Sequence, residues 1–253
     1  MRLGGFRLVG KSITYLIMNK VIWLYIFMGV LVGCLFDFTN TYIGGHAYST
    51  YFYFVVKVIF IAAWDVWLAV FVIQDLKHDR VNLTESLKQA CAHLTRAWWY
   101  IVWIVLLQVL FTFSLNMPKS HGETLPILLV FGCLGIFGVQ ALGNFFLIPL
   151  IANGFTGFIN AVGKTLVYLR RNFFTVLAAF CALFIMALIV FMAYGFCNIL
   201  LLMALEKIFS PTLVRLVMRV LLIQFLIFTM SSLLVIAQSI FYVHLPHQPI
   251  KNF

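Results

Sequence analysis

Long apolar stretches separated by short polar ones dominate the chain. A bilayer's hydrocarbon core is about 30 Å thick, so a helix needs roughly 20 mainly apolar residues to cross it. Six stretches approach or exceed that length: residues 21–36, 52–73, 98–115, 125–151, 173–205 and 213–243. The pattern predicts an all-α fold, a polytopic transmembrane helical bundle of about six spans.

The composition agrees with a membrane location. Hydrophobic residues make up 64% of the 253 residues and charged residues only 9%, whereas soluble domains carry roughly a quarter charged residues. A chain with so few charges cannot cover its surface in water, but in a bilayer the outer surface faces hydrocarbon. We therefore expect residues 1–253 to form a single integral membrane domain.

Basic residues gather in alternate connections, which sets the expected orientation. Residues 1–20, 74–97 and 152–172 are rich in Lys and Arg, whereas residues 37–51 contain neither and residues 117–124 contain only Lys119. Positive connections remain on the cytoplasmic side. The pattern predicts cytoplasmic N- and C-termini in a bacterial inner (plasma) membrane, with residues 1–20 as an N-terminal interfacial segment. Lys207, Arg215 and Arg219, on the expected outer side, depart from this pattern.

Two of the cytoplasmic connections have apolar residues at helical spacing. They are residues 82–98 and 155–169, and the first opens with Asn82 and Glu85, which is typical of a helix N-cap and its capping-box partner. Such helices lie in the membrane interface with the apolar side towards lipid, so we expect two interfacial elbow helices. The alternative is a pair of cytosolic loops with accidental periodicity.

The two elbow regions align with each other without a gap. Residues 71–74 fall over residues 146–149, and Arg96 falls over Arg171, in each case just before an aromatic pair. We interpret residues 52–116 and 125–205 as two helix–elbow–helix units, followed by a last transmembrane helix at 213–243. Both units enter from the same side, so the repeat is expected to be parallel. Chance resemblance between two amphipathic hairpins is the alternative.

Asp65 is the clearest candidate for a functional residue, because it lies near the middle of the second apolar stretch. Ionisable residues at that depth are costly and often functional. Counted from the outer ends, Gln140, Asn144 and Gln224 reach a similar depth. These four residues define a candidate polar midplane layer that could bind a cation, a proton or a headgroup. Hydrogen bonding between helices, which fixes their packing, is the favoured alternative.

Several cations are expected at the membrane boundaries. Candidates for contacts with lipid phosphates, or for simple interfacial anchoring, are Arg96, Arg170, Arg171, Arg215 and Arg219. Lys57 lies two turns outward of Asp65, and we expect its side chain to extend to the outer interface. The protein is therefore expected to contact membrane lipids.

The sequence offers little for catalysis, metal binding or nucleic-acid binding. The five cysteines are scattered without a CxxC pair, and the only close histidine pair, His244 and His247, is interrupted by a proline. Nucleotide-binding, hydrolase and metalloprotease motifs are missing, and no basic stretch is interleaved with aromatics as in a nucleic-acid module. We expect no enzymatic activity, no cofactor, no metal and no nucleic-acid partner.

One pattern resembles known membrane families. Residues 143–151 read Gly-Asn-Phe-Phe-Leu-Ile-Pro-Leu-Ile, and residues 168–174 read Tyr-Leu-Arg-Arg-Asn-Phe-Phe. This is similar to uncharacterised prokaryotic six-helix integral membrane protein families, which resemble the membrane domain attached to some glycerophosphodiester phosphodiesterases. The likeness covers about residues 55–190, in pattern only. It implies the six-helix architecture and a lipid-related context, and it carries over no catalytic residue.

Two functional classes remain. The preferred expectation is a non-enzymatic membrane subunit or organiser that interacts with lipids, with other membrane proteins or with itself. The alternative is a transporter or permease component for a small or lipidic solute, with Asp65 on its path. Active transport would then need a separate ATPase or an ion gradient, because the chain has no ATP-binding motif.

Overall fold

All regular structure in the described part of the chain is helical. The computed structural model describes residues 4–43, 47–77, 82–115, 132, 135, 143–155, 157–205 and 211–245, and no strand occurs in these ranges. A short helix, Gly143–Ala152, precedes α7. The longer helices are α1 (Gly5–Met18), α2 (Lys20–Ile43), α3 (Ala47–Leu76), α4 (Leu83–Arg96), α5 (Trp98–Leu115), α7 (Phe158–Leu205) and α8 (Pro211–Val243).

Within the described residues, four helices are long and apolar enough to cross a membrane. The qualifying segments are Lys20–Thr39, Val55–Leu76, Phe158–Met192 and Ile223–Val243. The expectation of an all-helical bundle with several membrane-length apolar helices is thereby confirmed. The other two expected spans correspond to α5 and to residues 125–151. Most of residues 125–151 lie outside the described part of the chain. The count of six spans stays a prediction.

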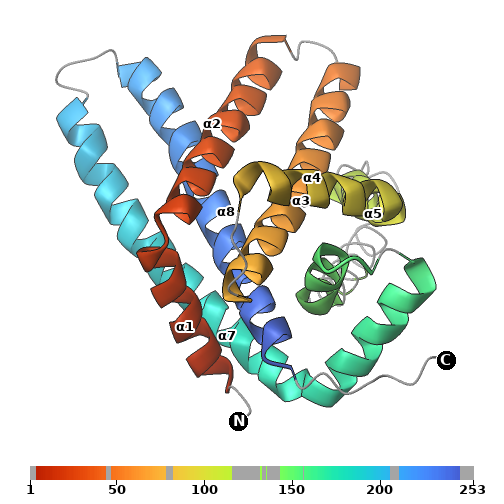
Figure 1. Ribbon diagram of the computed structural model, residues 1–253. Coiled ribbons are helices and arrows are strands. Elements are labelled where there is room, and N and C mark those ends of the chain that lie inside the picture. The colour runs from red at the N-terminus through yellow and green to blue at the C-terminus, as the bar shows by residue number, and fades with distance from the viewer. Residues whose placement is uncertain are drawn as a thin grey trace.

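Helix α8 lies at the centre of the bundle. It contacts α1, α2, α3 and α7, while α3 also packs against α4 and α5 (Figure 1). The core between these helices is built from large apolar side chains such as Leu68 of α3, Phe146 and Phe228, all almost fully buried. Because α8 has neighbours on most sides, it carries a continuous run of buried positions from 235 to 242.

The first helix is amphipathic and lies across the bundle before the first membrane-length helix begins. Its buried side carries Leu8, Val9 and Leu16, and Gly5 comes so close to α7 that an added Cβ would lie 2.7 Å from the Ala179 nitrogen. The helical conformation is interrupted at Asn19, whose side-chain oxygen accepts a hydrogen bond from the Val21 amide at 3.1 Å. Asn19 therefore caps the start of α2.

The two regions expected to form elbows are helical, and each has an identifiable boundary. The Asn82 side chain accepts the Thr84 amide at 3.0 Å, which confirms the expected N-cap of α4. The Gly143–Ala152 helix is followed by Gly154 with a φ of 88°, a conformation that glycine adopts readily at helix ends. Further on, α7 contains a non-helical residue at Asn172 and changes direction sharply there (Figure 1).

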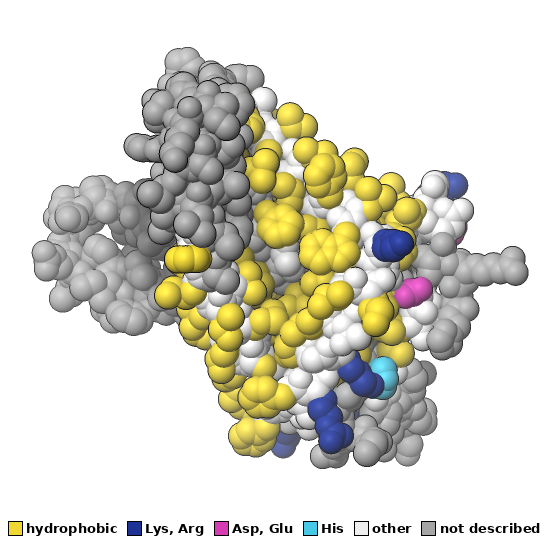
Figure 2. All heavy atoms as spheres, turned by 90° about the vertical axis from the view of Figure 1, so that its left-hand side faces the viewer, with side chains coloured by type: hydrophobic (Ala, Val, Ile, Leu, Met, Phe, Trp, Pro, Cys, Tyr) yellow, Lys and Arg dark blue, Asp and Glu magenta, His cyan; other side chains and the backbone are white. Residues whose placement is uncertain are grey.

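The outer surface of the long helices is strongly apolar. Figure 2 shows hydrophobic side chains spread over the middle of one face, with Lys and Arg gathered towards its lower and right-hand edges. Exposed apolar residues on this bundle include Phe27 and Leu35 of α2, Phe184 and Ile189 of α7, and Ile223 of α8. A soluble monomer rarely exposes so extensive an apolar surface, whereas a lipid-facing helix requires one.

Candidate functional site

Asp65 of α3 is bound by Ser231 of α8 inside the bundle. The Ser231 hydroxyl donates to the Asp65 carboxylate at 2.6 Å. Aromatic side chains surround this level of α3, with Trp64 packed at 5.0 Å from Trp67 and at 6.2 Å from Phe228 between ring centroids. Within the described part of the chain, Asp65 makes no ion pair. The contact joins the two central helices, as expected of an interhelical hydrogen bond.

A second polar cluster joins α2, α3 and α8 further along the bundle. Lys57 forms an ion pair with Asp37 at 2.6 Å, and the Gln224 amide donates to the other carboxylate oxygen of Asp37. Lys57 lies eight residues before Asp65, which is about 12 Å along the axis of α3. The Asp37–Lys57–Gln224 cluster is therefore separate from the Asp65–Ser231 contact.

Two glycines bring α2 against α8 beside this cluster. A Cβ added at Gly29 would lie 2.5 Å from the Phe228 ring, and one added at Gly33 would lie 2.4 Å from the Gln224 side-chain oxygen. Glycines four residues apart are a recurrent device that lets membrane helices approach closely. The Gly29-x-x-x-Gly33 spacing is the sequence signal that identifies this contact, together with Asp37 one turn later.

The four residues of the candidate midplane layer lie in different surroundings. Asp65 bonds to Ser231, Gln224 bonds to Asp37, and Asn144 lines a separate apolar cavity described below. Gln140 lies outside the described residues. The contacts therefore connect Asp65 and Gln224 to different partners, and the layer as a single binding site stays a prediction.

The arginines expected to contact lipid phosphates do not meet in a common pocket among the described residues. Arg96 ends α4, and Arg170 and Arg171 lie just before the bend at Asn172, all three with exposed side chains. The side chains of Arg215 and Arg219 lie outside the described residues. These three exposed arginines are therefore available to interfacial lipid individually and not as one site.

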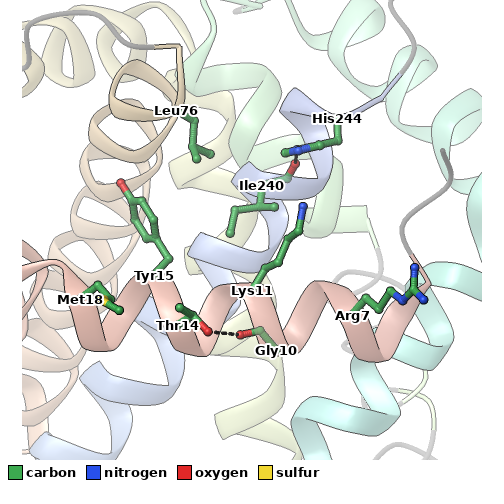
Figure 3. Close-up of a pocket in the computed structure, with 9 residues that line it drawn as sticks. All are labelled: Arg7, Gly10, Lys11, Thr14, Tyr15, Met18, Leu76, Ile240 and His244. Atoms are coloured by element: carbon green, nitrogen blue, oxygen red, sulfur yellow. Dashed lines mark hydrogen bonds between the residues drawn. The ribbon is translucent and has the colours of Figure 1, made fainter.

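A cationic cleft of about 660 Å³ opens between α1 and the C-terminal ends of α3 and α8. Figure 3 shows its residues, with Lys11 extending from α1 towards the end of α8 that carries His244, and Arg7 one turn earlier along α1. The cleft is also lined by Gly10, Thr14, Tyr15, Met18, Leu76 and Ile240. Because residues near both ends of the described chain line it, these two regions lie on the same side of the bundle.

Polar contacts fix the walls of this cleft. The Tyr15 hydroxyl donates to the Asp75 carboxylate of α3, and an imidazole nitrogen of His244 lies 2.8 Å from the Ile240 carbonyl oxygen. Burial, and then the bond to Asp75, raise the pKa of Tyr15 above its ordinary value, so its hydroxyl keeps the proton that it donates. Neighbouring Lys77 donates to Asn153 at 3.2 Å. The Tyr15–Asp75 bond joins α1 to α3 at the cleft.

A second cavity, of about 630 Å³, lies between α5, the Gly143–Ala152 helix and the first part of α7. Trp99, Trp103 and Leu166 form apolar parts of its lining, and Asn144 and Thr165 are the polar members. Thr165 is only 5% exposed, yet its hydroxyl has no hydrogen-bond partner among the residues that the structure describes. A buried hydroxyl without a partner is costly, which makes this cavity a candidate for an apolar ligand with one polar group.

The described residues provide no metal-ligand cluster, because no three His, Cys, Asp or Glu side chains come together among them. Burial lowers the pKa of His93 on α4 below its ordinary value, so its imidazole is neutral near pH 7. His93 therefore adds no positive charge to the surface formed by α4.

The fold and composition define the class as a helical bundle with membrane-length apolar helices. Comparisons with protein-family models, with curated proteins and with solved structures found no match for this chain. The functional argument therefore rests on the chain's own contacts and cavities.

Proposed function

We propose that this chain is a six-span integral membrane protein of the bacterial inner membrane with both termini in the cytoplasm. The alternation of basic and uncharged connections supports this orientation. Arg7 and His244 line one cleft, which agrees with termini on the same side. An even number of spans follows from that arrangement.

The two elbow helices lie in the cytoplasmic interface. In α4, Ala90 and Leu94 are buried against the bundle while Leu87 is exposed, and in the first part of α7 Ile159 and Leu166 are exposed. Exposed apolar side chains on an amphipathic helix beside membrane spans favour contact with lipid. The bend at Asn172 and the break at Ala97, between α4 and α5, occupy corresponding positions in the two units, which supports the parallel repeat.

The protein is a non-enzymatic membrane subunit or organiser that interacts with lipids or with other membrane proteins. One observation carries this proposal: the carboxylates described within the membrane-length segments are bound by groups on other helices. Asp65 is held by Ser231, and Asp37 is held by Lys57 and Gln224. Such contacts stabilise helix packing, and the separation of Asp37 from Asp65 argues against a paired-carboxylate acid–base site.

Purification in mild detergent followed by native mass spectrometry tests this function. We expect the full chain to retain phospholipid, or a membrane protein in fixed stoichiometry, and to be inactive in solute exchange after reconstitution into liposomes. Conductance or solute exchange by the chain alone would overturn the proposal, particularly if Asp65→Asn abolished it while leaving the melting temperature unchanged.

The second candidate is a permease component for a lipidic solute, and the cavity beside Trp99 and Trp103 favours it. Its apolar lining and the Thr165 hydroxyl, which has no partner among the described residues, suit a mostly apolar molecule. In that case a stoichiometric ATPase should co-purify, or an ion gradient should drive transport. Thr165→Val should then weaken solute binding while sparing the fold, since the substitution breaks no hydrogen bond of the described residues.

A further inference from the structure

In the described part of the chain, two cations that line the cleft beside α1 have no acidic partner. Arg7 and Lys11 lie four residues apart on α1 and both line the cleft (Figure 3). Within the described residues neither forms an ion pair, in contrast to Lys57, which is bound to Asp37. Side chains three or four residues apart share one face of a helix, so the two positive charges act on the same volume.

The rest of the cleft is apolar and has room for more than a headgroup. Met18, Leu76 and Ile240 form an apolar lining, and a Cβ added at Gly10 would meet nothing within 4 Å. A volume of about 660 Å³ lies in the range of small-ligand sites, roughly 300–1,000 Å³. An occupant that matches this lining carries negative charge at one end and hydrocarbon at the other.

The other polar groups around the cleft bond elsewhere. Asp75 accepts the Tyr15 hydroxyl, is not a lining residue, and forms no ion pair with Arg7 or Lys11 in the described part of the chain. Thr14 donates its hydroxyl to the Gly10 carbonyl at 3.1 Å. One ring nitrogen of His244 lies at the Ile240 carbonyl oxygen.

In the proposed topology the cleft lies at the level of the lipid headgroups. Helix α1 ends at Met18, and only Asn19 separates it from Lys20, where α2 begins the first membrane-length segment, so α1 lies beside one end of that segment. Anionic phospholipids attract basic side chains at the membrane surface.

We propose that this cleft binds one anionic glycerophospholipid. Its phosphate lies between Arg7 and Lys11, and its glycerol and upper acyl carbons lie against Met18, Leu76 and Ile240. This inference deepens the lipid interaction in the proposed function and rests on it. Free inorganic phosphate offers no hydrocarbon for the apolar wall, so the lipid is the occupant.

The test uses the full chain in nanodiscs that contain phosphatidylglycerol and phosphatidylcholine, with native mass spectrometry to count the lipid retained. Wild type should retain one phosphatidylglycerol in preference to phosphatidylcholine. The double variant Arg7→Gln/Lys11→Gln should lower the affinity for phosphatidylglycerol about 30-fold, since each basic residue near the surface contributes about fivefold.

A second variant separates the cleft from general surface attraction. Gly10→Phe keeps every charge but fills the cleft, and it should displace the retained lipid. Gly163→Phe is its matched control, because a Cβ at Gly163 also meets nothing within 4 Å and that residue lies outside the cleft. Lys20→Gln/Lys88→Gln is the charge-matched control, and because these two exposed lysines do not line the cleft, it should change retention of the lipid bound there less than threefold.

Two results would overturn the inference. One is retention of phosphatidylglycerol by Gly10→Phe at the wild-type level, and the other is equal retention of the two lipids by wild type. Added inorganic phosphate should leave the bound lipid in place, and displacement by phosphate at low millimolar concentration would identify a free-anion site instead. The liposome exchange assay tests the proposed function by a different readout, so the two can fail independently.

Discussion

The two ends of the α2–α3–α8 region differ in whether their described charged side chains have partners within the protein. Where α2 packs on α8, Lys57 and Asp37 bind each other and Gln224 completes the cluster. Beside the C-terminal ends of α3 and α8, Arg7 and Lys11 face a cleft without an acidic partner among the described residues. The first region is closely packed around two glycines, and the second is open.

This difference separates side chains that hold the fold from side chains that are available to a ligand. A charge buried among helices needs a partner within the protein, since leaving one unpaired costs several kcal/mol. A charge at the membrane surface can remain unpaired because water and lipid headgroups solvate it. Changes in the first region should therefore reduce stability, and changes in the second should alter lipid binding.

The largest effect is expected from Gly29→Leu. A Cβ there meets the buried Phe228 ring at 2.5 Å, so the added side chain must push α2 away from α8. Overpacking of this kind costs about 3 kcal/mol at the upper end of its usual range. Reversible unfolding in detergent measures this loss of unfolding free energy. The control is Gly10→Leu in the open cleft, whose free energy of unfolding should be within about 0.5 kcal/mol of the wild-type value. Equal losses from both variants would remove the distinction between packed and open regions.

Lys57→Met is expected to lower the free energy of unfolding by a smaller amount, about 2 kcal/mol. The substitution leaves Asp37 without its cation, and the pair is only 23% and 31% exposed at its two side chains. A double-mutant cycle with Asp37→Asn should give a coupling of at least about 1 kcal/mol. Additive single effects would show that the ion pair does not stabilise the bundle.

The smallest effect is expected at the contact between α3 and α8. Ser231→Ala removes the hydroxyl that donates to Asp65 and should cost about 1 kcal/mol. Asp65→Asn keeps an acceptor oxygen for Ser231 and should cost less. If Asp65→Asn were instead the more destabilising of the two, the carboxylate charge would have a role beyond this hydrogen bond.

The sequence predicted the helical class of the fold well because its signals are local. The lengths of the apolar stretches identified α2, α3, the second part of α7 and α8, and Asn82 identified the start of α4. The bend at Asn172 also falls close to the expected end of the second elbow. These features depend on composition and on short-range capping, both of which are readable along the chain.

Which polar side chains contact one another could not be predicted from the sequence. Counting residues from the helix ends gives an approximate depth but not the direction in which a side chain points, so it groups Gln224 with Asp65 although Gln224 bonds to Asp37. The charge pattern predicts that Asp37 begins a connection, whereas the structure has it inside α2, opposite Lys57. The cleft depends on how α1 packs on α7 and α8, which is a tertiary contact without a local signal.

Melting temperatures in nanodiscs with and without phosphatidylglycerol test the central claim most directly. Lys57→Met should melt below wild type by the same amount in both lipid compositions. Arg7→Gln/Lys11→Gln should match wild type in phosphatidylcholine alone and lose the stabilisation that phosphatidylglycerol gives to wild type. Two results would contradict the account. One is a lower melting temperature for Lys57→Met only when phosphatidylglycerol is present, and the other is a rise in melting temperature with phosphatidylglycerol in Arg7→Gln/Lys11→Gln as large as in wild type.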